Sequence, residues 1–218
     1  MVIEPGVKVI FANQYKFFVK GVLEAIGTEE DSIYFIPKDT ALGWGGISID
    51  KAEKLTIFDY CIVRYGSTNT PEILKILQSL DITECDTDPE CEAEIAADGG
   101  GILINNSDPV IRHCLISDNQ SLRNGGGIAV INNSNPQISF CKISNNRAAH
   151  LSGGGIYISG YSNPLINNCI IEENFAVNIG GGIYIHFYSV YQCVQLLCCD
   201  LYAMSRSIFL QTTQIDKM

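Results

Sequence analysis

The sequence predicts an all-β protein, a right-handed parallel β-helix in which each coil of roughly 27 residues contributes three short strands. Two observations predict it: a repeat of nearly constant period, and an alternation of apolar residues inside each repeat. The segment Gly-Gly-Gly-Ile begins at Gly99, Gly125, Gly153 and Gly180, so successive copies are 26, 28 and 27 residues apart. Strands this short bury no face alone, and only coils stacked about 4.8 Å apart make a continuous core.

Three further columns keep the same step. Each unit has a Ser-x-Pro segment, then a cysteine two residues before an isoleucine, then a closing asparagine: Ser107, Ser134 and Ser162; Cys114, Cys141 and Cys169; Asn119, Asn146 and Asn174. The glycine triplet before each first strand indicates a turn with positive φ and no space for a Cβ atom. Four columns that share one period are very improbable by chance, which favours the solenoid.

Alternation inside each unit assigns the strand faces. In Gly-Gly-Gly-Ile-x-Ile the two aliphatic positions point inward, so we expect the intervening Leu103, Ala129, Tyr157 and Tyr184 to point outward. The middle position of Cys-x-Ile holds Lys142 in one unit, and a lysine must face water, so the cysteines and isoleucines point inward. The segments that begin at the prolines give a third strand, with these inward residues: Ile111, Ile138 and Ile166. An odd step separates each of these isoleucines from the next cysteine, so a corner residue must interrupt the strand between them. The corner residues are His113, Phe140 and Asn168.

The same logic divides the chain into four parts. Residues 1–66 are expected to form the opening coils and residues 98–185 the regular repeats. Residues 67–97 are an insertion, in which Pro71 starts a short predicted helix that precedes an acidic loop. Residues 186–218 fit no coil and are predicted to be irregular or poorly ordered.

Composition excludes some functions. Lys and Arg total 14 against 24 Asp and Glu, and the net charge of −10 disfavours nucleic acid as a partner. The uncharged run 183–199 contains Gln, Ser and His, so no membrane span is expected. No signal peptide precedes the first strand, so the chain is expected to be either a fragment of a longer secreted protein or a cytosolic protein.

The pattern Gly-Gly-Gly-Ile-x-Ile, Ser-x-Pro-x-Ile, Cys-x-Ile-x-x-Asn resembles the right-handed parallel β-helix repeat proteins of the pectin-lyase-like fold. The resemblance covers about residues 1–66 and 98–185, and residues 3–7 and 25–28 are similar to the first coils of large bacterial surface proteins of that group. Residues 175–178 show a weaker likeness to polymorphic outer-membrane adhesins. The resemblance implies an extracellular or cell-surface location, but fold alone does not assign a function.

Two carboxylates are weak candidates for catalysis. Asp118 and Glu173 share a turn column with Asn145, and the period predicts a separation of about 9.6 Å, near the span of inverting glycosidases. Solvated turn residues are the favoured interpretation, because the column simply takes short polar side chains. The clustered aspartate ligands and the basic residue of related polysaccharide-cleaving enzymes are missing from the outer strand positions.

The cysteines and the acidic loop raise the question of metals. The four cysteines that precede the second strand, Cys61, Cys114, Cys141 and Cys169, are interpreted as small core residues rather than metal ligands. Cys85 and Cys91 are a disulfide candidate if the protein is exported. Between them Asp86, Asp88 and Glu90 are weak Ca²⁺ candidates, because the glycine and the closing glutamate of an EF-hand are missing.

Two functions remain open from the sequence. The first is a non-catalytic secreted or cell-surface scaffold, adhesive or binding glycans or surface proteins, with Tyr157 and Tyr184 as the ligand-binding residues. No cofactor is expected, although Ca²⁺ is possible. The second is a fragment of a polysaccharide lyase or glycoside hydrolase whose groove lies on coils outside this chain.

Overall fold

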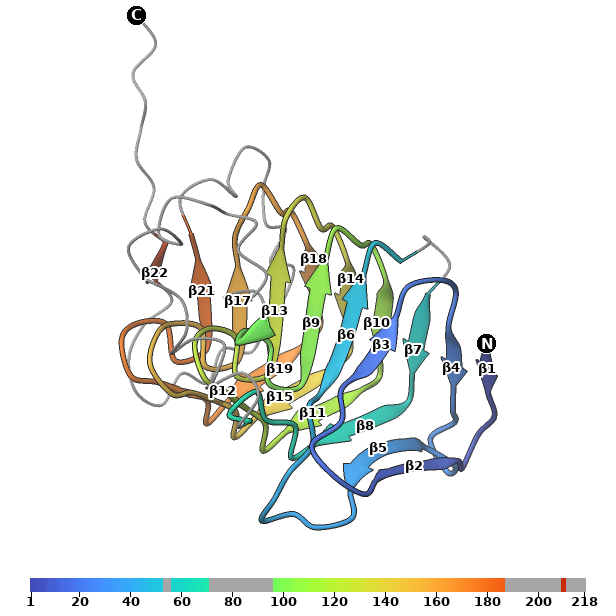
Figure 1. Ribbon diagram of the computed structural model, residues 1–218. Coiled ribbons are helices and arrows are strands. Elements are labelled where there is room, and N and C mark those ends of the chain that lie inside the picture. Colours follow the sequence, from blue (N-terminus) through green and yellow to red (C-terminus); the bar gives the residue numbers. More distant parts are fainter. Residues whose placement is uncertain (53–55, 71–95, 187–208, 211–218) are drawn as a thin grey trace, which may run out of the picture.

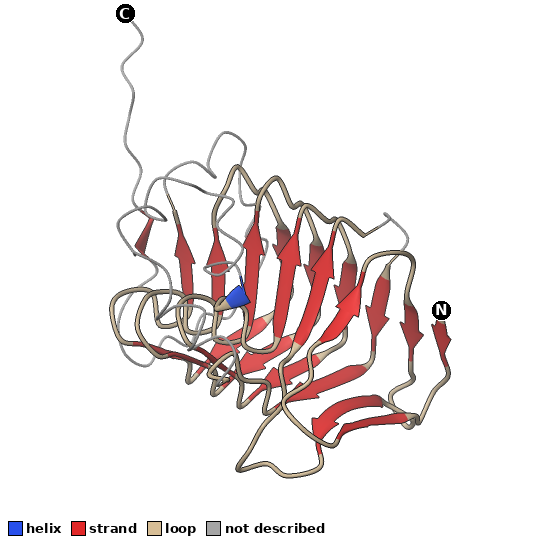
Figure 2. Cartoon of the chain, in the orientation of Figure 1, coloured by secondary structure: helices blue, strands red, loops and turns tan. Residues whose placement is uncertain are grey.

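The computed structural model describes residues 1–52, 56–70, 96–186 and 209–210, and these residues form a parallel β-solenoid (Figure 1). Three long sheets run along the stack, and strands are the dominant element of the described chain (Figure 2). Each coil enters sheet A, turns a corner into sheet B, and returns through sheet C. The predicted all-β fold with three strands per coil is confirmed.

The strands are short, as the repeat requires. Sheet A contains β1 (Val2–Ile3), β4 (Glu24–Ile26), β7 (Ile57–Asp59), β10 (Val110–Arg112), β14 (Gln137–Ser139) and β18 (Leu165–Asn167). Sheet B contains β2 (Lys8–Phe11), β5 (Ile33–Pro37), β8 (Cys61–Arg64), β11 (Leu115–Ser117), β15 (Lys142–Ser144) and β19 (Ile170–Glu172). Sheet C contains β3 (Phe17–Val19), β6 (Ile47–Asp50), β9 (Ile102–Asn105), β13 (Ile128–Ile131), β17 (Ile156–Ile158), β21 (Ile183–Ile185) and β22 (Phe209–Leu210). A fourth ladder, between sheets B and C, contains β12 (Gln120–Ser121), β16 (Arg147–Ala148) and β20 (Phe175–Ala176).

Strand register stacks the repeat columns directly on one another. Ile102 pairs with Ile128, Ile128 with Ile156, and Ile156 with Ile183, all in parallel. These four side chains are at most 4% exposed and belong to one core cluster that runs along the solenoid. The cysteines of the repeat lie in the same core, as predicted.

Corners between sheets A and B are made by residues with left-handed backbone. His113, Phe140 and Asn168 have φ values of 50°, 54° and 49°, and Tyr60 has 49° at the same position one coil earlier. This turn explains how the chain passes from an inward isoleucine to an inward cysteine across an odd number of residues. The predicted corner is confirmed.

The closing asparagines form a buried amide ladder between sheets B and C. Asn119 Nδ2 donates to Asn146 Oδ1 at 3.0 Å, and Asn146 Nδ2 donates to Asn174 Oδ1 at 3.0 Å. Each asparagine also donates to a strand carbonyl of the preceding coil. The ladder satisfies the buried polar groups where the backbone turns away from the sheet.

The glycine triplets are required by the close approach of successive coils. A Cβ atom on Gly126 would lie 2.5 Å from the backbone nitrogen of Arg147 and from the carbonyl oxygen of Gly154. The first glycine of each triplet has positive φ, for example 64° at Gly125. Both halves of the sequence prediction for these turns are confirmed.

The two described ends of the predicted insertion, residues 67–70 and 96–97, lie next to each other. Thr68 Oγ1 donates to the Ala97 carbonyl at 2.8 Å and accepts from the Leu122 backbone N–H at 2.7 Å. Residues 71–95 lie outside the described residues, and so do the predicted helix after Pro71 and most of the C-terminal segment.

The outer face of sheet C differs from the prediction. Leu103 and Ala129 were expected to face water, but they are 2% and 0% exposed and form a second apolar cluster with Ile131. Tyr184 is 8% exposed. The alternation correctly placed these residues outside the main core, but it carried no information about what packs over the outer face of a strand.

Candidate functional site

Three aromatic side chains stack at the corner between sheets A and B. Tyr60, His113 and Phe140 occupy this corner in three successive coils, and we call these three residues the corner stack. The ring centroids of Tyr60 and His113 lie 4.6 Å apart with an interplanar angle of 14°. Those of His113 and Phe140 lie 5.2 Å apart at 17°. The left-handed corner directs all three side chains outward, so the coil repeat produces the stack.

A buried carboxylate fixes the middle ring of the corner stack. Asp59, at the end of β7, has a side chain only 8% exposed. Its Oδ2 accepts from Arg112 Nε at 2.8 Å, and its Oδ1 lies 2.9 Å from His113 Nδ1. A buried carboxylate needs well-placed hydrogen-bonding partners, and Arg112 and His113 supply them. Asp59 therefore orients His113 against its neighbours.

The corner stack becomes more exposed along the chain. Tyr60 is half-buried, whereas Phe140 is 55% exposed. The next corner residue is Asn168, which is exposed and has no ring to continue the stack. An aromatic surface of this kind is suited to binding, because neighbouring rings held in fixed positions form an apolar patch.

The tyrosines predicted to bind ligand lie on the outer face of sheet C. Tyr157 and Tyr184 are stacked, with ring centroids 5.8 Å apart and an interplanar angle of 11°. Tyr157 is partly exposed, and burial is the main factor that raises its pKa to about 12. Because Tyr184 is buried, a ligand on this face would reach Tyr157 first.

Charged side chains at the edge of the same face are partly desolvated. Lys16 Nζ donates to the Ala96 carbonyl at 3.2 Å, and burial lowers the Lys16 pKa to about 8 although Asp98 opposes the shift. Asp98 is buried, and its Oδ1 accepts from the backbone N–H and side-chain amide of Asn124. These contacts attach residues 96–98 to the first and fourth coils.

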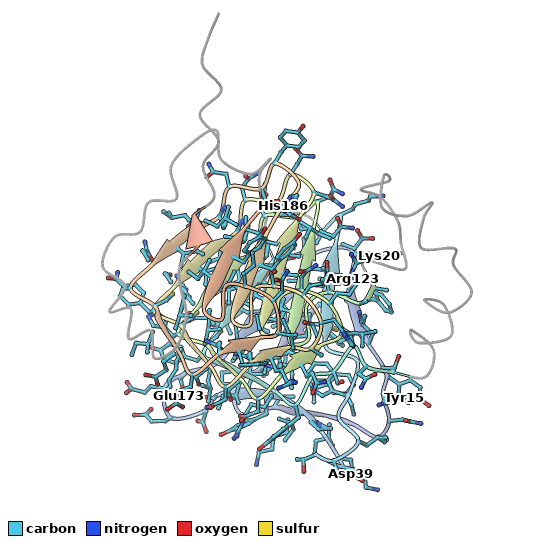
Figure 3. The ribbon with its side chains drawn as sticks, turned by 90° about the vertical axis from the view of Figure 1, so that its left-hand side faces the viewer. Tyr15, Lys20, Asp39, Arg123, Glu173 and His186 are labelled. Carbon is cyan, nitrogen blue, oxygen red and sulfur yellow. The ribbon has the colours of Figure 1, made fainter. Side chains whose placement is uncertain are left out.

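The two carboxylates considered for catalysis, Asp118 and Glu173, share a turn column, as predicted, but their surroundings differ. Asp118 Oδ2 accepts from Arg64 Nε at 3.0 Å and Nη2 at 2.8 Å, and from Ser117 Oγ at 2.8 Å. These three contacts leave Oδ2 fully engaged. Glu173 is exposed and lies away from Arg123 and His186 (Figure 3). The surroundings of neither residue resemble those of a paired acid and base.

The repeat cysteines are reduced and buried in a thiol column. Cys61, Cys114, Cys141 and Cys169 are at most 3% exposed. Burial raises the pKa of Cys114, which disfavours the thiolate that metals and electrophiles need. Among the described residues, no group of three His, Cys, Asp or Glu side chains is placed to hold a metal ion.

The disulfide candidate and the weak Ca²⁺ candidates fall outside the described residues. They are Cys85, Cys91, Asp86, Asp88 and Glu90. Their roles stay predictions. In the part of the chain that the structure describes, no helix is long and apolar enough to cross a membrane.

Comparison with known families agrees with the geometry. A family model described as a right-handed β-helix region matches residues 41–194, well over half of the chain. The chain therefore belongs to the right-handed β-helix family. No curated protein and no solved structure matches it.

The corner stack was missed at the sequence level. The sequence placed His113, Phe140 and Asn168 at corners, but it did not predict that the rings of this column stack. The sequence held a signal for it: Tyr60 directly precedes Cys61, just as His113 directly precedes Cys114 one coil later. Three of four corner residues are thus aromatic, and stacked coils place them in contact.

Proposed function

We propose that this chain is a non-catalytic binding scaffold of a secreted or cell-surface protein, and that it binds glycans through the corner stack. The observation that carries the proposal is the exposed, ordered series of Tyr60, His113 and Phe140 on a rigid solenoid. Sugars bind proteins through aromatic side chains and hydrogen-bonding groups that are already held in place. Surface location rests on the resemblance to exported β-helix proteins.

The described charges favour binding over polysaccharide cleavage. Asp118 is engaged by Arg64 and Ser117, so it is poorly placed to take a proton from a substrate. The Asp59 carboxylate is likewise occupied by Arg112 and His113. Both carboxylates have structural roles in the corner and turn columns, which supports a scaffold.

A glycan panel tests the proposal. We expect the wild-type chain to retain neutral oligosaccharides or polysaccharides, and Phe140→Ala to lose about tenfold in affinity, the magnitude of one aromatic contact. Tyr161→Ala is the matched control, because Tyr161 is 64% exposed but lies in the turn between sheets C and A. Equal binding by both variants would place the site elsewhere, with Tyr157→Ala the next variant to measure.

Enzyme assays test the alternative. Incubation with polygalacturonate and alginate, with and without Ca²⁺, is expected to release neither unsaturated nor reducing ends. Products that disappear in Asp118→Ala or Glu173→Ala protein would instead establish a lyase or a hydrolase and refute the non-catalytic scaffold.

A further inference from the structure

The corner stack ends in two rings, Tyr60 and Phe140, and Phe140 is the more exposed of the two. His113 lies between the other two rings and presents mainly its edge to solvent, and Tyr60 is half-buried. Phe140 contacts His113 on one side only. Its other side is directed along the solenoid toward the next coil, where strand register pairs Ser139 with Asn167 and therefore places Asn168 beside Phe140.

The position next to Phe140 is accessible and chemically mixed. Asn168 is exposed, and its side-chain amide has no hydrogen-bond partner among the described residues. On the sheet B side, Ile170 is 46% exposed and pairs in register with Lys142. The position thus offers an aromatic face, an apolar side chain and a free amide that both donates and accepts.

Local charge selects the kind of ligand. Arg112 ends β10 just before His113, and Lys142 begins β15 just after the Phe140 corner. Their side chains are 45% and 50% exposed, and they disfavour a cation. Glu172 pairs with Lys142 at 2.7 Å, and Glu173 follows it, so an anion also meets like charge. The net charge of −10 further disfavours acidic glycans. A neutral ring with hydroxyl groups fits best.

We propose that one neutral pyranose residue binds on the free face of Phe140 and continues the stack in the position that a fourth corner ring would occupy. Its C–H face lies on Phe140, its hydroxyl groups bond to the Asn168 amide, and its rim contacts Ile170. The inference rests on the proposed glycan-binding function and names the subsite. The coil step of about 4.8 Å matches the spacing at which rings stack.

The decisive variant fills the subsite with a protein ring. Asn168→Tyr extends the corner stack to four rings, and the backbone accepts it, because Tyr60 has the same φ of 49° as Asn168. Saturation-transfer NMR is measured with the methyl glycosides of glucose, galactose, mannose and N-acetylglucosamine. We expect transfer to the C–H face of at least one glycoside in the wild type, and its loss in both Asn168→Tyr and Phe140→Ala.

Controls separate this inference from the proposed function. Phe175→Ala removes another half-exposed aromatic, which stacks on Arg147 away from the corner, and should leave the signal unchanged. If glycans on the panel bind wild type and Asn168→Tyr equally, the subsite is wrong while the binding function stands. If no glycan or glycoside binds the wild type, both fail. Binding of arginine methyl ester in place of the glycosides would overturn the neutral-sugar assignment in favour of a cationic partner. Circular dichroism confirms that each variant is folded.

Discussion

Replacing Asn146 with alanine should destabilise the solenoid strongly, although no apolar contact is involved. Asn146 Oδ1 accepts from the backbone N–H and the side-chain amide of Asn119, at 3.1 and 3.0 Å. Its Nδ2 donates to the Ile116 carbonyl at 2.9 Å and to Asn174 Oδ1 at 3.0 Å. The residue is 1% exposed, so water does not replace these partners.

The expected loss follows from the groups left without partners. Alanine at position 146 removes the acceptor of two buried N–H groups on Asn119 and one donor to the Ile116 carbonyl. An unsatisfied buried polar group costs about 1 to 3 kcal/mol, so Asn146→Ala should lower the free energy of unfolding by about 2 to 5 kcal/mol. That is a large part of the stability of a typical domain.

Equilibrium urea unfolding followed by circular dichroism measures this change. The matched control is Asn145→Gly, since Asn145 is exposed, has a φ of 57°, and should lose little when glycine takes over its left-handed backbone. A loss below about 1 kcal/mol for Asn146→Ala, or one equal to the control, would show that the ladder does not stabilise the fold as argued.

The remaining predictions concern packing and charge. Gly126→Ala should lower the free energy of unfolding in urea by about 2 kcal/mol or more, because the added Cβ would clash with backbone atoms. Gly21→Ala is the control, since nothing lies within 4 Å of its Cβ, and it should change stability little. Similar losses in both variants would contradict the packing argument. With a Lys16 pKa of about 8 in the folded chain against 10.5 in the unfolded chain, the unfolded chain holds more protons between these values, so stability should rise from pH 8 to 10.5. Lys16→Met should remove that rise and stabilise the protein by about 1 to 3 kcal/mol at pH 7, and an unchanged pH profile would refute the desolvation of Lys16. Asp118→Asn should cost less than about 1 kcal/mol, because its ion pair with Arg64 is partly exposed; a loss of several kcal/mol would show that the pair is effectively buried.

The amino-acid sequence by itself determined the solenoid, its period and its inward columns. A repeated unit with aliphatic residues two apart has few ways to bury them, and stacking in register is the one that aligns identical columns. Hence the inward isoleucines, the thiol column, the glycine turns and the corner positions could all be predicted. The turn column of Asp118 and Glu173 followed from the same period.

Only the tertiary structure decided how the outward side chains are used. Whether an outward residue is exposed depends on what packs against it in the folded chain, and Leu103 and Tyr184 are buried although they point away from the main core. Likewise, Asp118 was revealed as an ion-pair partner only when Arg64, 54 residues earlier, was placed one coil away. The period fixes which residues share a column. Contacts between columns depend on the folded geometry, and these contacts define the candidate site.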